Sequence, residues 1–294
     1  MAFFDDLEKR SSDQRSTENA TLLKDILNLA VNLDGYKAAF SSVDFSTFKS
    51  LENLPSLPVL RKSDLSQKQI KGNLLGGYSS KKPFHFAHIF QSPGPIYEPG
   101  GISHDWWRIG RFLHALNIGN GDIVQNCFSY HLTPAGMIFE SGARAVGAAV
   151  VPAGVGQTEL QVRAASDIGS NVYSGTPDYL KIILDKADEM GEKLSFNRAA
   201  VGGGALFPSL RQEYADRGIV CRQNYATADL GNVAYESEAL DGMIVDEGVI
   251  VEIVTPGTGN PVPTGEVGEV VVTSLNADYP LIRFATGDLS AFME

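Results

Sequence analysis

Two patterns of apolar residues alternate along the chain from residue 84 onward. Short continuous apolar runs predict buried strands, and apolar positions that recur every three or four residues predict amphipathic helices. The expected strands are 86–90, 123–128, 148–152, 171–174, 199–202 and 220–225. The expected helices are 134–146, 157–167, 177–190 and 210–216. Strands that alternate with helices in this way predict a mostly parallel sheet flanked by helices, which is an α/β fold.

One further helix is expected just after residue 103. Ser103 is a suitable N-cap for it. Its apolar positions are Trp106, Ile109, Phe112, Leu113 and Leu116. Arg108 and Arg111 are expected to turn away from the buried face.

The pattern changes after about residue 240. Residues 249–254 and 269–273 are β-branched runs, joined by the sequence TPGTGNPVPTGEVG. Two such runs with a turn-rich connection predict an antiparallel pair. A smaller antiparallel β element near the C-terminus is therefore expected.

The first 78 residues differ from the rest in composition and pattern. Leu22, Leu23, Ile26, Leu27, Ala30 and Val31 make one amphipathic helical face. Pro55 and Pro58 punctuate the following segment, which predicts an irregular connector. We therefore expect a helical arm and connector over 1–78, an α/β nucleotide- and acid-binding core over 79–240 and a β subdomain over 241–294. The arm is compatible with a homodimer contact, although such faces more often pack within their own chain.

Net charge limits the kinds of partner that the chain could bind, and the cysteines and the N-terminus indicate its cellular compartment. The 294 residues carry a formal net charge of -11, which argues against nucleic acid and anionic membranes as partners, because both attract basic surfaces. The two cysteines, Cys127 and Cys221, lie in apolar runs without a metal-ligand pattern. We expect buried thiols in a reducing compartment. The acidic N-terminus lacks an apolar leader segment, which favours a cytoplasmic protein.

Several catalytic signatures are missing from the sequence, among them GxSxG, HExxH and any Gly-Lys pair. The triple glycine Gly202–Gly204 resembles the start of a dinucleotide fingerprint, but Phe207 occupies the last glycine position. A dehydrogenase-like domain would therefore rest on these three glycines alone. Glycines at a strand end also let a planar group approach the backbone, because no Cβ intervenes, and a simple tight turn is an equal alternative.

The stretch YPLIRFATGDL, residues 279–289, predicts an apolar strand that breaks at Thr286 and Gly287. The carboxylate of Asp288 is then expected at the strand end. A carboxylate there suits a sugar diol, because it accepts two hydrogen bonds at once. A strand followed by an ordinary Asx turn is the alternative.

Seven stretches in this order resemble the phenylacetate-CoA ligase family, which belongs to the adenylate-forming, AMP-binding enzymes. They are LPVLRKSDL (57–65), QSPGPIYEPGG (91–101), VVPAGVGQTELQV (150–162), GTPDYL (175–180), the triple glycine, NYATADLG (224–231) and RFATGDL (283–289). The resemblance covers the family's N-terminal large domain. It implies that a small carboxylic acid, expected to be aromatic, reacts with ATP to give an acyl adenylate, from which coenzyme A displaces AMP. The implied cofactors are ATP/AMP, Mg²⁺ and coenzyme A as co-substrate.

The resemblance also implies roles for particular residues. The nucleotide-binding positions are Ser92, Gly94, Gly202, Gly203, Gly204, Asn224, Tyr225, Ala226, Thr227 and Asp288. Among them, Asp288 matches the residue that holds ribose hydroxyls, and Tyr225 matches the aromatic near adenine. The acid pocket would be formed by Tyr130, His131, Thr133 and Ala135; a core strand entering a helix is an equal alternative for this stretch. Asp229 stands where the family has a Glu that helps to hold magnesium, and its oxygen ligands suit Mg²⁺.

The phosphate loop departs from the family pattern. Pro93 and Pro95 contribute no amide donor, and Glu98 occupies the position of a lysine. At about 4 Å and an effective dielectric of about 20, one unit pair is worth about 4 kcal/mol, so reversing the charge opposes ATP binding. Glu98 is expected either to recruit a further Mg²⁺ or to pair with Arg108 or Arg111.

Members of the family continue beyond the TGDL stretch into a mobile lid that carries a lysine used in adenylation. These 294 residues stop at Glu294, so we expect them to lack that lid, to contain no catalytic lysine and to turn over slowly. The alternative reading is a non-catalytic nucleotide- or acid-binding protein on the same fold.

Overall fold

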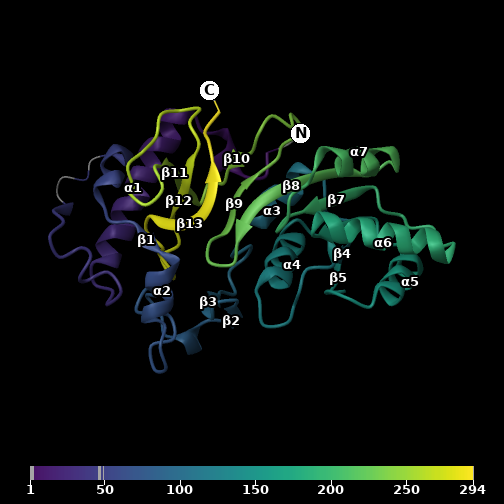
Figure 1. Cartoon of the computed structure of the whole chain (residues 1–294), viewed down its shortest axis with the longest axis horizontal. Coiled ribbons are helices and arrows are strands. Elements are labelled where there is room, and N and C mark those ends of the chain that lie inside the picture. The colour runs from purple at the N-terminus through teal and green to yellow at the C-terminus, as the bar shows by residue number, and fades with distance from the viewer. Residues whose placement is uncertain (1–2, 46–47, 49, 294) are drawn as a thin grey trace. The chain divides into compact units, whose positions relative to one another are not determined.

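The computed structural model describes residues 3–45, 48 and 50–293. The chain forms two compact units (Figure 1). Residues Ile102–Asp246 make one of them, here called the central unit. Residues Met1–Gly101 and Glu247–Glu294 make the other, here called the terminal unit. The expected division into three segments stays a prediction.

The central unit is built on a seven-stranded sheet with the order β10-β9-β8-β7-β6-β4-β5. Its strands are β4 (Ile123–Asn126), β5 (Ala149–Val151), β6 (Val172–Gly175), β7 (Arg198–Val201), β8 (Val220–Thr227), β9 (Gly231–Tyr235) and β10 (Ile244–Val245). The five strands from β4 to β8 are parallel. This confirms the α/β fold expected from the alternating pattern. The antiparallel strands β9 and β10, which extend the sheet beyond β8, were not anticipated.

Five helices accompany these strands. They are α3 (Ile109–Ala115), α4 (Ala135–Ala145), α5 (Thr158–Ile168), α6 (Pro177–Met190) and α7 (Pro208–Asp216). Helix α3 precedes β4, and the other four each connect two successive strands. Side chains of α5, α6 and α7 share one apolar cluster with β6, β7 and β8, which includes Val162, Leu180, Tyr214 and Cys221. Helix α3 packs against α4. The helices therefore bury their apolar faces as their spacing predicts.

The expected start of α3 after Ser103 is wrong. The helix begins at Ile109, and both Asp105 (φ 48°) and Arg108 (φ 63°) have left-handed backbone conformations ahead of it. The carboxylate of Asp105 accepts a hydrogen bond from the Gly110 amide at 2.9 Å, so Asp105 satisfies a helix donor in place of Ser103. Arg111 is also only 6% exposed instead of turned to solvent.

The terminal unit contains a four-stranded sheet with the order β1-β13-β12-β11. Its strands are β1 (Leu60–Arg61), β11 (Val249–Val254), β12 (Gly268–Ser274) and β13 (Phe284–Ser290). The antiparallel pairing of β11 with β12 confirms the expected β element. Strand β1 adds to β13 in parallel, so segments from both ends of the chain share this sheet.

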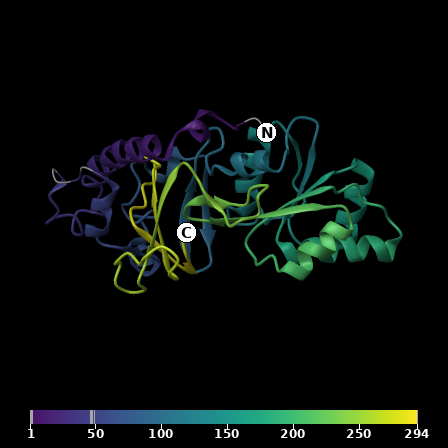
Figure 2. The same cartoon turned by 90° about the horizontal axis from the view of Figure 1, so that it is seen from above.

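The remaining elements of the terminal unit come from its N-terminal segment. They are η1 (Asp6–Lys9), α1 (Ser12–Ala30), η3 (Leu51–Ser56), α2 (Lys62–Lys68), η4 (Pro83–His85), β2 (His88–Ser92) and β3 (Ile96–Gly100). Helix α1, in purple in Figure 2, runs beside the yellow strands of the same unit. It buries Leu23, Ile26, Leu27 and Ala30 as expected, whereas Leu22 is 46% exposed. Among the described helices, none is long and apolar enough to cross a membrane.

Candidate nucleotide and acid site

The strands β4, β6 and β7 of the central unit end side by side. Asn126 pairs with Ser174, and Gly175 pairs with Val201, so the segments that follow these strands leave the same edge of the sheet. The chain order reverses here, because β5 lies on one side of β4 and β6 on the other. Ligands of open α/β sheets bind outside the carboxyl ends of the strands at such a reversal.

The triple glycine follows β7 at this edge. A Cβ on Gly202 would lie 2.4 Å from the Oδ1 atom of Asn224, so only glycine fits there without a shift of its neighbours. Gly203 has a left-handed backbone (φ 68°), and a Cβ there would lie 3.8 Å from Phe128 and 3.9 Å from Thr176. The glycines therefore adjoin the segments that leave β4 and β6.

Asn224 belongs to a chain of buried polar side chains. Its amide donates to the Asn232 Oδ1 atom at 2.9 Å, and the Asn232 amide donates to Asp246 at 3.3 Å. Arg108 donates to the other oxygen of Asp246 at 2.8 Å. The Oδ1 atom of Asn224 is buried and accepts no hydrogen bond from any described residue. A buried acceptor of this kind normally has a partner, so it offers a ligand a place to donate.

The sequence indicated Asn224 but not its supports, Asn232, Asp246 and Arg108. These residues come from β9, the end of the central unit and the turn before α3. They share no motif spacing, and only the hairpin of β8 with β9 brings the two asparagines together. Arg108 pairs with Asp246 in the structure, whereas the sequence suggested Arg108 as one partner for Glu98.

The end of β8 carries the remaining nucleotide-binding candidates of this unit. Tyr225 pairs with Ala234, and the register shifts between Tyr225 and Ala226. Thr227 is the last residue of β8, and its hydroxyl accepts from the Leu230 amide at 3.1 Å. Asp229 lies in the turn that leads to β9. The hairpin therefore presents Tyr225 and Asp229 close together in the chain, each half-buried.

The acid-pocket candidates lie in the loop between β4 and α4. The Tyr130 hydroxyl accepts from the Asn126 side-chain amide at 2.8 Å. Burial, followed by the nearby Glu140 carboxylate, raises the pKa of Tyr130, so the hydroxyl remains a neutral donor at physiological pH. Thr133 and Ala135 are half-buried, whereas His131 is exposed. The loop joins the same sheet edge as the glycines through Phe128.

The phosphate-loop candidates form a β-hairpin in the terminal unit. The expectation of a loop over 91–101 is wrong, because Ser92 pairs with Ile96, and Glu98 pairs with Phe90 across β2 and β3. Ile96 and Tyr97 favour a strand, and residues 93–95 supply the turn with Gly94 at φ 150°. Glu98 is 1% exposed in this hairpin.

Asp288 lies within a strand, which corrects the expectation that it follows a strand end. Between the pairs Ala285–Val271 and Leu289–Glu269, β13 has more residues than β12, so Thr286, Gly287 and Asp288 form a bulge. The Thr286 hydroxyl donates to the Val270 carbonyl at 3.1 Å and accepts from the Asp288 amide at 3.2 Å. The bulge exposes the Asp288 side chain, as bulges beside functional sites often do.

The expected start of the same strand at residue 280 is also wrong. Strand β13 begins only at Phe284, because backbone groups just before it form hydrogen bonds with a side chain instead of with a neighbouring strand. The Tyr36 hydroxyl donates to the Pro280 carbonyl and accepts from the Ile282 amide, both at 2.8 Å. Leu281 and Ile282 are buried although they are not part of a strand, which explains why this apolar run resembles one.

Metal and thiol candidates complete the site description. The described residues contain no group of three His, Cys, Asp or Glu side chains that could hold a metal ion. Asp229 and Glu98 belong to different units, and their role toward Mg²⁺ stays a prediction. Cys127 and Cys221 are both buried free thiols, as expected. Burial raises the pKa of each to about 12, which argues against a thiolate nucleophile.

Comparison with curated proteins finds phenylacetate-coenzyme A ligases. The chain is 28% identical to that of Thermus thermophilus over 267 residues, which are 85% of this chain and 59% of the relative. It is 28% identical to that of Aromatoleum evansii over 306 residues, covering 98% of this chain and 68% of the relative. The Escherichia coli ligase is also 28% identical, over 98% of this chain and 70% of its own length. No family model matches the chain.

Solved structures agree on the fold. An open conformation of 2-hydroxyisobutyryl-CoA ligase in complex with 2-HIB-AMP and CoA superposes with a TM-score of 0.90 at 22% identity, covering 98% of this chain and 72% of that one. The o-succinylbenzoate CoA synthetase of Bacillus subtilis gives a TM-score of 0.55 at 14% identity, over 72% of this chain and 48% of that one. These likenesses place the chain in the adenylate-forming large-domain fold.

Proposed function

Because the chain is 28% identical to three phenylacetate-coenzyme A ligases, we propose that it belongs to their family and contributes to the AMP-forming activation of a small carboxylic acid. The chain spans 59% of the length of the Thermus thermophilus relative, so the proposal concerns the part of the reaction that these residues can carry. In that reaction the acid attacks the α-phosphorus of ATP and releases pyrophosphate. The thiol of coenzyme A then attacks the acyl carbon and releases AMP.

One observation carries the proposal. The glycines after β7, the loop after β4 and the polar end of β8 meet at one edge of the central sheet, where the chain order reverses. Three parts of a site that are separate in sequence are thus adjacent in space. This convergence favours a ligand site over the tight-turn alternative for the glycines.

The adenine end of the nucleotide fits the glycine edge. The free Oδ1 atom of Asn224 would accept from the adenine amino group, beside the position where Gly202 leaves no room for a Cβ. Tyr225 would stack near the base, as the family resemblance implies. For the terminal unit, the family resemblance implies that Asp288, whose side chain is exposed on the bulge of β13, is the residue that binds ribose hydroxyls through its carboxylate oxygens.

The acid would enter the loop between β4 and α4. The Tyr130 hydroxyl and the Thr133 hydroxyl would orient the carboxylate, and Ala135 would leave space at the start of α4. Phe128 stacks on Phe139 with ring centroids 4.1 Å apart, which supports an aromatic acid, because aromatic rings pack well against one another. His131 is exposed and would contact the acid only from the rim.

Phosphate handling would differ from that of the family. Mg²⁺, held by Asp229, would neutralise charge on the phosphate oxygens. Strands β2 and β3 pair with each other, and Pro93 and Pro95 in the turn have no amide hydrogen, so the hairpin offers few free backbone donors. This observation favours the second candidate, a non-catalytic nucleotide- or acid-binding protein on the same fold.

A calorimetric titration tests the site first. AMP and, separately, ATP with Mg²⁺ are added to the chain and to the variants Asp288→Ala and Asn224→Ala. Loss of the ribose or adenine contact is expected to weaken the binding of both nucleotides at least about tenfold, because a hydrogen bond to a buried or charged group is worth about 1.5–3 kcal/mol. Glu266→Ala and Asn120→Ala remove exposed groups of matching type and serve as controls.

The outcomes separate the two candidates. Binding of both nucleotides, together with pyrophosphate exchange that depends on added acid, supports the ligase proposal. Binding of AMP without any exchange supports the non-catalytic alternative. If neither nucleotide binds at millimolar concentration, the nucleotide site itself is refuted.

A further inference from the structure

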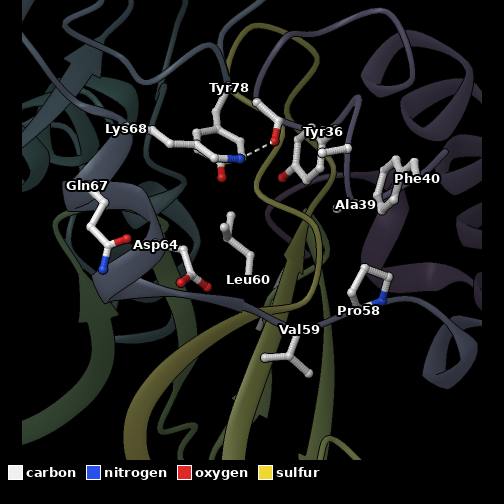
Figure 3. Close-up of a pocket in the computed structure, with 12 residues that line it drawn as sticks. Tyr36, Ala39, Phe40, Pro58, Val59, Leu60, Asp64, Gln67, Lys68 and Tyr78 are labelled. Carbon is white, nitrogen blue, oxygen red and sulfur yellow. Dashed lines mark hydrogen bonds between the residues drawn. The ribbon is translucent and has the colours of Figure 1, made fainter.

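A second pocket lies in the terminal unit, apart from every residue assigned above. Its volume is about 290 Å³, near the lower end of the range of small-molecule sites. The apolar part of its lining includes Tyr36, Phe40, Pro58, Val59 and Leu60. The polar part comes from α2 and Tyr78 (Figure 3). An apolar pocket with a few convergent polar groups is the usual form of a ligand site.

Two opposite charges stand on one face of α2 at the pocket. Asp64 and Lys68 are four residues apart, a spacing that normally allows an ion pair. No such pair forms between them in the described structure. Lys68 donates instead to the Gly35 carbonyl at 2.7 Å, and Asp64 accepts from the Arg61 amide at 3.1 Å. The ammonium and the carboxylate are therefore held apart, and each keeps hydrogen-bonding capacity for a ligand.

Tyr78 adds a further polar group to the lining of the pocket. Its side chain is 1% exposed and lies against the Lys68 ammonium, 5.1 Å from the ring centroid. Its hydroxyl makes no hydrogen bond with any described residue, and Figure 3 shows it directed into the pocket above Leu60. A hydroxyl that faces the pocket without a protein partner can donate a hydrogen bond to a ligand oxygen.

From this arrangement we propose that the pocket binds a free amino acid with an apolar side chain. The carboxylate of the ligand would bind Lys68 and Tyr78, and its ammonium would bind Asp64. The side chain would lie on Leu60, Pro58 and Phe40. The lining charges sum to zero, which matches a zwitterion better than a ligand with a single charge.

The pocket wall is connected to the strand that carries Asp288. Tyr36 lines the pocket, and its hydroxyl bridges Pro280 and Ile282 just before β13. An amino acid in the pocket would pack against this ring. The site is thus suited to a regulator, although its binding does not depend on the proposed ligase function.

The decisive experiment compares ligands that share one side chain. L-phenylalanine, phenylacetate and phenethylamine are titrated separately into the unmodified 294-residue chain by calorimetry up to about 10 mM, and L-leucine is added as a smaller amino acid. At least one of the two amino acids is expected to bind. L-phenylalanine should bind at least about tenfold more tightly than phenethylamine, because each charged contact contributes about that factor.

Variants locate the binding. Lys68→Met and Asp64→Asn should each weaken amino-acid binding at least about tenfold, and Tyr78→Phe by a smaller factor. Lys71→Met removes an exposed lysine outside the pocket and should change nothing. Asp288→Ala should weaken nucleotide binding while leaving amino-acid binding intact, which keeps this proposal separate from the nucleotide site.

Three results would overturn the proposal. One is that neither amino acid binds. Another is that phenethylamine binds as tightly as L-phenylalanine. The third is that amino-acid binding persists unchanged in both Lys68→Met and Asp64→Asn, which would place the ligand elsewhere, for example in the acid pocket.

Discussion

Beside β13 of the terminal unit, a buried arginine contacts several segments of the chain directly, whereas beside β8 of the central unit, two buried amides lead to the buried Asp246 carboxylate. Arg283 is 1% exposed and forks onto the Glu252 carboxylate at 2.9 and 3.1 Å. It also donates to the carbonyls of Pro55, Leu57 and Gly259. Beside β8, the corresponding role falls to the amide pair of Asn224 and Asn232.

The difference follows from how each unit is assembled. The central unit is one continuous segment, and its two asparagines meet across a hairpin. The terminal unit joins two distant segments, and the five-donor fork of Arg283 can reach carbonyls from both of them. A buried charge with several acceptors thus ties together parts of the chain that no local turn connects.

Removing Arg283 should have the largest effect. Arg283→Met leaves Glu252 buried without its cation and three carbonyls without their donor, which should cost about 3–5 kcal/mol of unfolding free energy. Urea unfolding followed by circular dichroism measures the loss. Limited proteolysis should show early cleavage in the terminal unit.

Arg283→Lys is the matched control. It keeps the charge but loses the planar fork, so its cost should be clearly smaller than that of Arg283→Met. Equal costs for the two variants would mean that charge contributes little and would break the contrast between the units.

Gly202→Ala tests the central unit. The new Cβ would lie 2.4 Å from the Asn224 Oδ1 atom, and the required shift should cost about 1–3 kcal/mol. Gly204→Ala is the control from the same loop, because its Cβ would meet Pro177 at 3.4 Å. Differential scanning calorimetry of both variants measures the difference. A Gly202→Ala protein as stable as Gly204→Ala would show that β8 is not tightly packed there.

Tyr36→Phe removes the hydroxyl that bridges Pro280 and Ile282. One buried donor and one buried acceptor lose their partner, so the free energy of unfolding should fall by about 1–2 kcal/mol. Tyr78→Phe is a matched control, since its hydroxyl has no partner among the described residues, and it should cost close to nothing. Chemical denaturation of the two variants gives the comparison. Similar losses would argue against the bridge as a support for β13.

The smallest effect concerns the pH dependence of the buried pair. Burial raises the pKa of Glu252, although Arg283 opposes the shift. The folded state then holds its proton more tightly than the unfolded state, whose glutamate pKa is about 4.3. The stability that Glu252 contributes is therefore present below that pH and lost as the pH rises through the folded pKa.

Glu252→Gln makes this contribution measurable. The unfolding free energy of the wild-type chain minus that of the variant should decrease as the pH rises above about 4.3, by at most about 1.4 kcal/mol for each unit that separates the two pKa values. Urea titrations at several pH values test it. A difference that increases with pH would show that pairing with Arg283 outweighs burial.

Two regular elements with clear local signals have the expected bounds, and most others differ by one or two residues. Helix α6 runs from Pro177 to Met190 as expected, because a proline suits its first position and Gly191 ends it in a left-handed conformation. Strand β11 likewise has the expected bounds, Val249–Val254. The nucleotide and acid candidates of the central unit gather at one sheet edge, which the βα order anticipates.

Elements that depend on distant partners were not predictable. The apolar run before Arg283 resembles a strand, but Tyr36, far away in the sequence, takes its backbone groups. Helix α3 starts later than expected, at a point where the Asp105 carboxylate accepts a hydrogen bond from the Gly110 amide. Arg108 and Asp246 lie far apart in the chain, so no spacing rule connects them to Asn224.

The amino-acid sequence by itself determined the α/β class, the antiparallel β element and the resemblance to phenylacetate-CoA ligases, because periodicity and motif order are local properties of the chain. The tertiary structure decided which polar groups are shared between segments. It turned the expected phosphate loop into a hairpin, placed Asp288 on a bulge and held Asp64 apart from Lys68. Each of these depends on a hydrogen bond or strand pair made after the chain has folded, and periodicity carries no information about such partners.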